Sequence, residues 1–175
     1  MGTDIEPDRF RTVIASTALR IAKINIETEK LPFHENEFDA AIFHEIFEHL
    51  RINLIDTLGK IYKVIKPGGT LFLSTPNLLC LSGWVSFALK NKAPGDIFSQ
   101  YEKLEKIGHM GHVREYTPTE VCIFLEKIGF QIDEIIFRGS YDLSTSWKRK
   151  LSKSILAVMP SLRPIFSVIA TKLAY

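Results

Sequence analysis

The sequence predicts an α/β fold organised around a strand–helix–strand unit over residues 31–77. Residues 38–43 form an apolar run of strand length. Apolar residues then recur three and four positions apart, as on one face of a helix; they are Phe47, Leu50, Leu54, Leu58, Ile61 and Ile65. A Lys-Pro-Gly-Gly run at 66–69 ends this helix, and residues 70–74 indicate a second buried strand. Two strands joined through a helix in this way pair in parallel.

Helical patterns flank this unit on both sides. Residues 7–19 indicate a short amphipathic helix, and residues 78–89 indicate an apolar one. Residues 91–111 are polar and predict a lid-like insertion. A Thr-Pro-Thr-Glu run at 117–120 is a capping box that starts a further helix, which Gly129 ends. Strands are predicted from alternating or buried apolar patterns over residues 20–26, 130–137 and 166–173.

Bulk properties predict one ordinary globular domain. We expect a single domain over 1–175, with an insertion over 78–116 and a C-terminal segment over 143–175. A net charge of +2 gives no reason to expect a nucleic-acid partner. Cys80 and Cys122 stand in apolar contexts, and the first ten residues lack a signal-peptide pattern, so we expect a reducing, cytoplasmic location. The oligomeric state stays open.

The unit over 31–77 carries five short motifs in order: Leu-Pro-Phe, a strand opening with Phe-Asp, Glu-His-Leu at a helix start, Lys-Pro-Gly-Gly, and a strand ending in Thr-Pro-Asn. This set resembles the class I methyltransferases that use S-adenosylmethionine. The resemblance implies a Rossmann-like sheet, mostly parallel with one antiparallel strand near the end, and helices on both faces. It also implies methyl transfer to a small-molecule acceptor, with a hydroxyl group weakly favoured.

The resemblance assigns five residues to the cofactor. In the family, a Gly-x-Asp step ends the second strand and its acid receives the ribose hydroxyls, a position that Asp4 matches. Glu27 and Thr28 stand where an acid and a small residue contact the adenine, and Phe43 and His44 end the next strand. The alternatives are that Asp4 caps the following helix in a loose terminus and that Glu27 is a solvated loop acid.

One family motif is missing. The glycine-rich turn between the first strand and first helix is absent, because Gly2 is the only glycine before Gly59. We therefore expect an N-terminally incomplete, truncated domain, in which loss of the central strand leaves a gap or makes its neighbours close up. Cofactor affinity should suffer. This favours, as an alternative, a non-catalytic binding or scaffold protein; a nicotinamide-dependent oxidoreductase also needs a glycine fingerprint.

The Glu-x-x-Glu-His run at 45–49 predicts a catalytic or metal site. Glu45, Glu48 and His49 stand at i, i+3 and i+4, so we expect them to share one helix face. Methyltransferases of small-RNA 2′-hydroxyls and of ubiquinone biosynthesis use such a set with a later histidine, which His112 matches, to hold a divalent cation such as magnesium on the acceptor hydroxyls. His49 and His112 are the predicted catalytic residues. The alternative is structural: an acid suits a helix N-terminus, and the histidines can be packing residues.

The C-terminal stretch 147–173 combines basic and aromatic residues. Two interpretations stay open for it. It is either a solvated helix face or a segment in peripheral contact with an anionic membrane surface.

Overall fold

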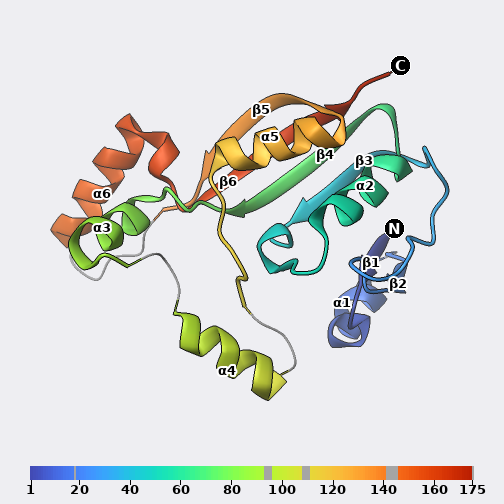
Figure 1. Cartoon of the computed structure of the whole chain (residues 1–175), viewed down its shortest axis with the longest axis horizontal. Coiled ribbons are helices and arrows are strands. Elements are labelled where there is room, and N and C mark those ends of the chain that lie inside the picture. Colours follow the sequence, from blue (N-terminus) through green and yellow to red (C-terminus); the bar gives the residue numbers. More distant parts are fainter. Residues whose placement is uncertain (18, 93–95, 108–110, 141–145, 175) are drawn as a thin grey trace.

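The computed structural model describes residues 1–17, 19–92, 96–107, 111–140 and 146–174 (Figure 1). The chain begins with a small parallel sheet, in which β1 (Gly2–Asp4) pairs with β2 (Ile21–Lys23). A 3-10 turn, η1 (Pro7–Phe10), and the short helix α1 (Arg11–Ser16) connect the two strands. The helix predicted over 7–19 is thus shorter and divided, and residue 18 of that prediction lies outside the described residues.

The larger sheet has four strands in the order β3-β4-β6-β5. β3 (Phe38–His44) runs parallel to β4 (Ile65–Pro76), whereas β6 (Ile165–Lys172) runs antiparallel to both β4 and β5 (Phe130–Arg138). This confirms the predicted mostly parallel sheet with one antiparallel strand near the end. The described strands form two separate sheets, so β1 and β3 have not closed up into one.

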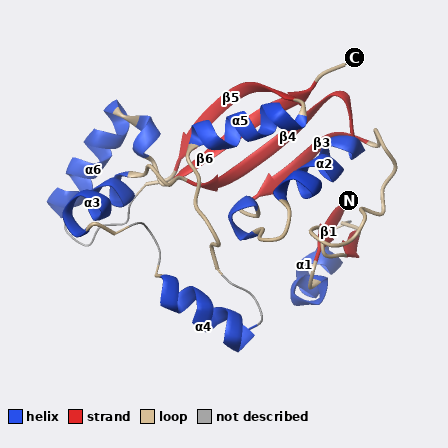
Figure 2. Ribbon diagram, in the orientation of Figure 1, coloured by secondary structure: helices blue, strands red, loops and turns tan. Residues whose placement is uncertain are grey.

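Helices α2 (Leu54–Val64) and α5 (Pro118–Ile128) cover one face of the larger sheet (Figure 2). Leu58 of α2 and Leu125 of α5 form a core with inward side chains of the strands, which include Leu71, Val168 and Ala170. On the opposite face Ile42 and Phe72 stay exposed at neighbouring positions of β3 and β4. The core therefore sits between the sheet and these two helices.

The helix predicted from Phe47 onward is interrupted. A single 3-10 turn, η2 (Phe47–His49), is followed by extended backbone at Leu50. Asn53 then starts α2 as a separate helix, because its side-chain Oδ1 accepts a hydrogen bond from the backbone N–H of Asp56 at 3.1 Å. The apolar residues have the predicted spacing, but the cap at Asn53 separates η2 from α2, so they do not lie on one continuous helix.

The end of α2 depends on contacts from distant parts of the chain. The buried Lys172 ammonium on β6 donates to the carbonyl oxygens of Tyr62 at 2.9 Å and Ile65 at 2.8 Å. The backbone N–H groups of residues 36–37 donate to the carbonyls of residues 63–64, each at 2.9 Å. These bonds satisfy the last carbonyls of the helix. Burial lowers the pKa of Lys172.

The remaining helices lie beyond the two sheets. They are α3 (Leu81–Lys90), α4 (Ile97–Ile107) and α6 (Ser146–Val158), with a 3-10 turn η3 (Pro160–Leu162) leading into β6. The start of the predicted C-terminal segment, at 143, falls outside the described residues, and the domain boundaries stay predictions. Among the described helices none is both long and apolar enough to cross a lipid bilayer.

The capping box at the start of α5 is present as predicted. Thr117 Oγ1 accepts from the Glu120 backbone N–H at 3.2 Å, and Glu120 Oε2 accepts from the Thr117 backbone N–H at 2.9 Å. The bond from the Thr117 backbone N–H, with a smaller effect from the charge of Arg114, lowers the pKa of Glu120. Because folding favours the carboxylate, its stabilising contribution is complete above the ordinary pKa of 4.5 and is lost as the pH falls through the lower folded-state pKa.

Replacing Glu120 by glutamine is expected to remove this part of the pH dependence. The wild-type chain should be more stable than E120Q at neutral pH, and the two should converge in strong acid. Urea denaturation at a series of pH values measures this. Thr117→Ala is the matched control for the cap itself and should cost about 1 kcal/mol at neutral pH. An advantage over E120Q that persists undiminished in acid would contradict the assignment.

Candidate functional site

A polar cluster lies at the carboxyl ends of β3 and β4. His44 and Ser74 are paired positions at these strand ends, and the Glu45 backbone N–H donates to the Ser74 carbonyl at 2.9 Å. The turn η2 begins two residues after Glu45. In open α/β sheets ligands bind outside the carboxyl ends of the strands, so this edge is the place where chemistry is expected.

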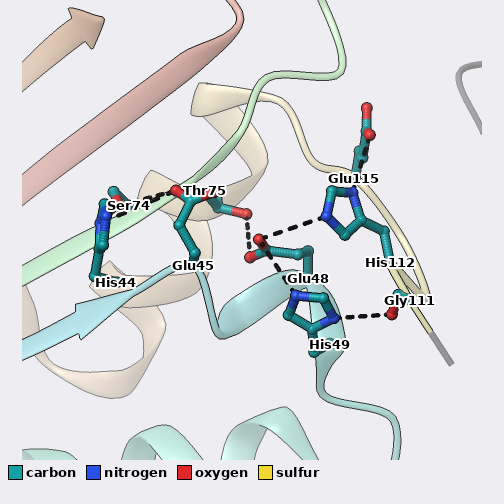
Figure 3. Close-up of polar contacts among 9 residues, drawn as sticks. All are labelled: His44, Glu45, Glu48, His49, Ser74, Thr75, Gly111, His112 and Glu115. Carbon is teal, nitrogen blue, oxygen red and sulfur yellow. Dashed lines mark hydrogen bonds and ion pairs between the residues drawn. The ribbon is translucent and has the colours of Figure 1, made fainter. Parts of the chain in front are cut away.

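Glu48 is the centre of the cluster (Figure 3). Its side chain is buried, with the residue only 1% exposed, and its Oε2 accepts a hydrogen bond from the Thr75 hydroxyl at 2.9 Å. Its Oε1 is buried and has no hydrogen-bond partner among the described residues. That atom lies 3.8 Å from Nε2 of His49 and 4.0 Å from Nε2 of His112. A buried carboxylate oxygen without a bond is costly, which marks this position as one that a ligand or proton would stabilise.

Both histidines present the same nitrogen to Glu48. Nδ1 of His49 lies 2.9 Å from the Gly111 carbonyl oxygen, and Nδ1 of His112 lies 3.3 Å from Glu115 Oε1. Each of these oxygens can only accept, so each Nδ1–H donates. In the neutral rings Nε2 then carries the lone pair, and both Nε2 atoms face Glu48 Oε1. The rings lie 5.1 Å apart in an edge-to-face arrangement.

The segment 111–116 is held against η2 by backbone and aromatic contacts. The Val113 N–H donates to the Glu48 carbonyl at 2.8 Å. The Tyr116 ring packs edge-on against Phe47 with centroids 4.8 Å apart, and burial raises the pKa of Tyr116. The Leu78 N–H donates to the Tyr116 carbonyl at 3.0 Å. These contacts bring His112 to Glu48 across a long separation in sequence.

The donor set suits a borderline divalent cation better than magnesium. Glu48, His49 and His112 each offer one ligand atom, and these atoms lie within 4.8 Å of one another. Two imidazoles and one carboxylate are typical of sites for iron(II), manganese or zinc, whereas magnesium prefers oxygen ligands. The Nδ1 bonds to Gly111 and Glu115 are the outer contacts that orient metal-binding histidines.

Glu45 does not join this cluster, which corrects the prediction that it shares a helix face with Glu48 and His49. Glu45 has a positive φ of 51° and precedes η2, so helical spacing does not apply to it. Its Oε1 instead accepts a hydrogen bond from the Ser74 hydroxyl at 3.1 Å. The Ser74 hydroxyl also makes a short contact with Nδ1 of His44, so these three side chains form a neighbouring network.

Residues 1–73 match the family model described as "Methyltransferase domain". The match spans less than half of the chain, and over these residues the chain is similar to that family. No curated protein matches its sequence.

Solved structures show the same fold at low sequence identity. A S-adenosylmethionine-dependent methyltransferase of Archaeoglobus fulgidus is 18% identical with a TM-score of 0.62, over 98% of this chain and 75% of that one. One from Mesorhizobium loti is 16% identical with a TM-score of 0.63, and the match covers 97% of this chain and 78% of that one. The 1,6-didemethyltoxoflavin-N1-methyltransferase of Burkholderia thailandensis is 13% identical with a TM-score of 0.57, and the match covers 98% of this chain and 60% of that one.

The residues predicted to bind the cofactor have different surroundings in the structure. Asp4 ends β1, where its Oδ1 accepts from the Glu6 N–H at 2.6 Å. Glu27 Oε1 accepts from the backbone N–H groups of Arg51 and Ile52, both at 2.7 Å. Glu27 therefore ties the loop after β2 to the loop after η2. Thr28 is exposed beside it.

Phe43 and His44, the two residues of β3 predicted to bind the cofactor, differ in burial. Phe43 is buried in the core, so its side chain supports the strand, whereas the His44 side chain is largely exposed at the strand end. The cofactor role of Asp4, Glu27, Thr28, Phe43 and His44 stays a prediction. The sequence offers no glycine-rich turn to receive the methionine end of S-adenosylmethionine.

Ser74, Thr75 and Glu115 are site residues that sequence reasoning did not select. Ser74 and Thr75 are polar and buried at the end of an apolar strand, which is a signal for a binding edge in a parallel sheet. Glu115 stands three residues after His112, within the segment that the family resemblance had already singled out.

Proposed function

We propose that this chain transfers a methyl group from S-adenosylmethionine to a hydroxyl group of a small-molecule acceptor at the cluster of Glu48, His49 and His112. One observation carries the proposal: a buried carboxylate oxygen, without a hydrogen-bond partner in the described part of the chain, faces two oriented imidazoles. S-adenosylmethionine supplies an electrophilic methyl group when bound. A hydroxyl acceptor needs help to lose its proton, and this cluster can provide that help.

The histidines would accept the acceptor's proton. Each neutral ring has its Nδ1–H bound to an oxygen, so Nε2 is the basic nitrogen of His49 and of His112. Proton uptake at either Nε2 creates an imidazolium beside Glu48 Oε1, at 3.8 or 4.0 Å. The buried carboxylate stabilises that charge because its surroundings screen it weakly. The Thr75 hydroxyl holds the carboxylate in place through Oε2.

A divalent cation is the second way in which these residues would activate a hydroxyl. Glu48 Oε1 and the two Nε2 atoms would hold it, and the bonds at each Nδ1 would orient the rings. The cation would act as a Lewis acid on the acceptor oxygen. The same geometry supports both versions, so metal dependence has to be measured.

A small acceptor is favoured by one similar protein. The Burkholderia thailandensis N1-methyltransferase was solved with 1,6-didemethyltoxoflavin and S-adenosylhomocysteine bound. That ligand belongs to that protein, and its methylated atom is a nitrogen, so the hydroxyl preference proposed for this chain rests on the cluster.

Calorimetric titration with S-adenosylhomocysteine tests the cofactor part of the proposal. We expect micromolar binding, weakened about tenfold or more by Asp4→Asn, because a charged acceptor for the ribose hydroxyls is lost. Asp8→Asn is the matched control, since Asp8 is an exposed acid that pairs with Arg11 and should not matter. Titrations with Mn²⁺ and Mg²⁺ test the cation, and the manganese affinity should be the higher.

A negative titration would decide between the proposed function and its alternative. If the folded chain binds no S-adenosylhomocysteine at millimolar concentration, the proposed activity of this chain is wrong. A non-catalytic binding or scaffold protein of the same family would then be the better interpretation. If cofactor binds but manganese does not, the histidines act as bases without a metal.

A further inference from the structure

Helix α6 carries an exposed apolar stripe opposite its attachment to the rest of the molecule. Ser152 and Leu156 are buried and fix the inner face of the helix. Trp147, Leu151 and Val158 are 64%, 53% and 83% exposed, and their spacing of four and seven places them along one outer face. A stripe of this kind on a surface helix is costly in water unless something covers it.

The same part of the chain is strongly positive. Residues 143–175 contain no aspartate or glutamate, whereas α6 alone includes Arg149, Lys150 and Lys153. Lys150 borders the apolar stripe, and both lysines are exposed. Long basic side chains can lie along apolar surface and place their charges at its rim. The outer face of α6 is therefore apolar, with Lys150 at its border and Lys153 exposed farther round the helix.

Helix α3, at the same edge of the sheet, also has exposed apolar side chains and lacks acidic ones. Trp84, Phe87 and Leu89 are all exposed, and residues 78–95 contain no acidic side chain. α3 follows the carboxyl end of β4, while α6 and η3 join the ends of β5 and β6 that pair there. Asn77 Nδ2 links the two regions by donating to the carbonyl oxygens of Ser161 at 2.8 Å and Arg163 at 2.9 Å. Figure 1 shows both helices at the end of the molecule away from β1 and β2.

We propose that α6, with α3 beside it at this edge, docks the protein onto an anionic phospholipid surface. The apolar stripe would enter the boundary between headgroups and acyl chains, and the basic border would contact the phosphates. Charge complementarity selects this occupant, because an anionic surface matches a region that lacks acidic side chains. The inference does not depend on methyl transfer.

Co-sedimentation of the full chain with lipid vesicles tests the proposal. We expect binding to vesicles of phosphatidylcholine with phosphatidylserine, and much weaker binding to phosphatidylcholine alone. Lys150→Gln with Lys153→Gln should lower the partition coefficient about 20-fold, and the remaining binding should be less sensitive to salt. Leu151→Glu with Val158→Glu should lower it about 100-fold or more.

The control is Ile123→Glu, which places a glutamate on an exposed apolar position of α5. This variant should bind vesicles as the wild type does, and circular dichroism should show that all variants are folded. A second readout is the emission of Trp147 in a Trp84→Phe background, which should shift to the blue on anionic vesicles only.

Three outcomes would overturn the proposal. The first is that the chain does not bind anionic vesicles. The second is that the α6 variants bind them as strongly as the Ile123→Glu control. The third is that the chain does not bind vesicles but self-associates, and that L151E with V158E abolishes the self-association. The last result would mean that a second copy of the chain covers the stripe, and sedimentation velocity would reveal it.

Discussion

Replacing Glu48 by glutamine is expected to lower methyl transfer about 10²- to 10⁴-fold while changing the free energy of unfolding by less than about 1 kcal/mol. The amide keeps the shape of the carboxylate and can still accept from the Thr75 hydroxyl, as Oε2 does at 2.9 Å. It cannot stabilise an imidazolium at His49 or His112, nor supply a charged oxygen to a cation. Stability should change little because one buried oxygen of the carboxylate lacks a hydrogen-bond partner within the ranges that the structure describes.

The measurement combines methyl transfer from labelled S-adenosylmethionine to a panel of hydroxylated acceptors with urea denaturation. Glu126→Gln, an exposed acid on α5, is the matched control and should leave both quantities unchanged. If E48Q lost several kcal/mol of stability and activity fell only in proportion to the unfolded fraction, Glu48 would be a structural residue. A manganese titration of E48Q then separates the two chemical versions: manganese affinity should fall at least about tenfold if a cation is used.

Replacing Phe47 by alanine is expected to lower the free energy of unfolding by about 3–5 kcal/mol. Phe47 is almost fully buried and packs edge-on against Tyr116 and Phe124, with ring centroids 4.8 and 5.7 Å away. These contacts hold the segment that carries His112 against η2. A loss of this size is a large part of the stability of a small domain, and the position of His112 should become less defined.

Urea denaturation followed by circular dichroism measures this effect as a lower midpoint at unchanged slope. Phe87→Ala on α3 is the matched control, because that ring is exposed, and its cost should stay within about 0.5 kcal/mol. The loss in the free energy of unfolding for Phe47→Leu should lie between those of Phe47→Ala and Phe87→Ala. Equal losses for Phe47→Ala and Phe87→Ala would contradict the assigned role of Phe47 in the core.

The candidate site was predictable only in part. The motif resemblance pointed to Glu48, His49 and His112, and the structure brings these three together. The expectation that Glu45 shares a helix face with Glu48 and His49 was wrong, because it assumed one continuous helix from residue 45. The positive φ at Glu45 and the cap at Asn53 divide that segment. The unpaired oxygen of Glu48 had no sequence signal, because it depends on which groups the fold leaves near it.

The sequence by itself determined the elements whose causes are local. The apolar spacing of α2, the capping box of α5 and the strand patterns of β3 and β5 act through residues a few positions apart, so they can be recognised without the fold. Only the tertiary structure decided the contacts between distant residues. Lys172 caps the Tyr62 carbonyl of α2 from 110 positions away, and His49 is oriented by a carbonyl 62 positions away. The physical reason is that strand order and register determine which distant groups meet, and neither is encoded in any short segment.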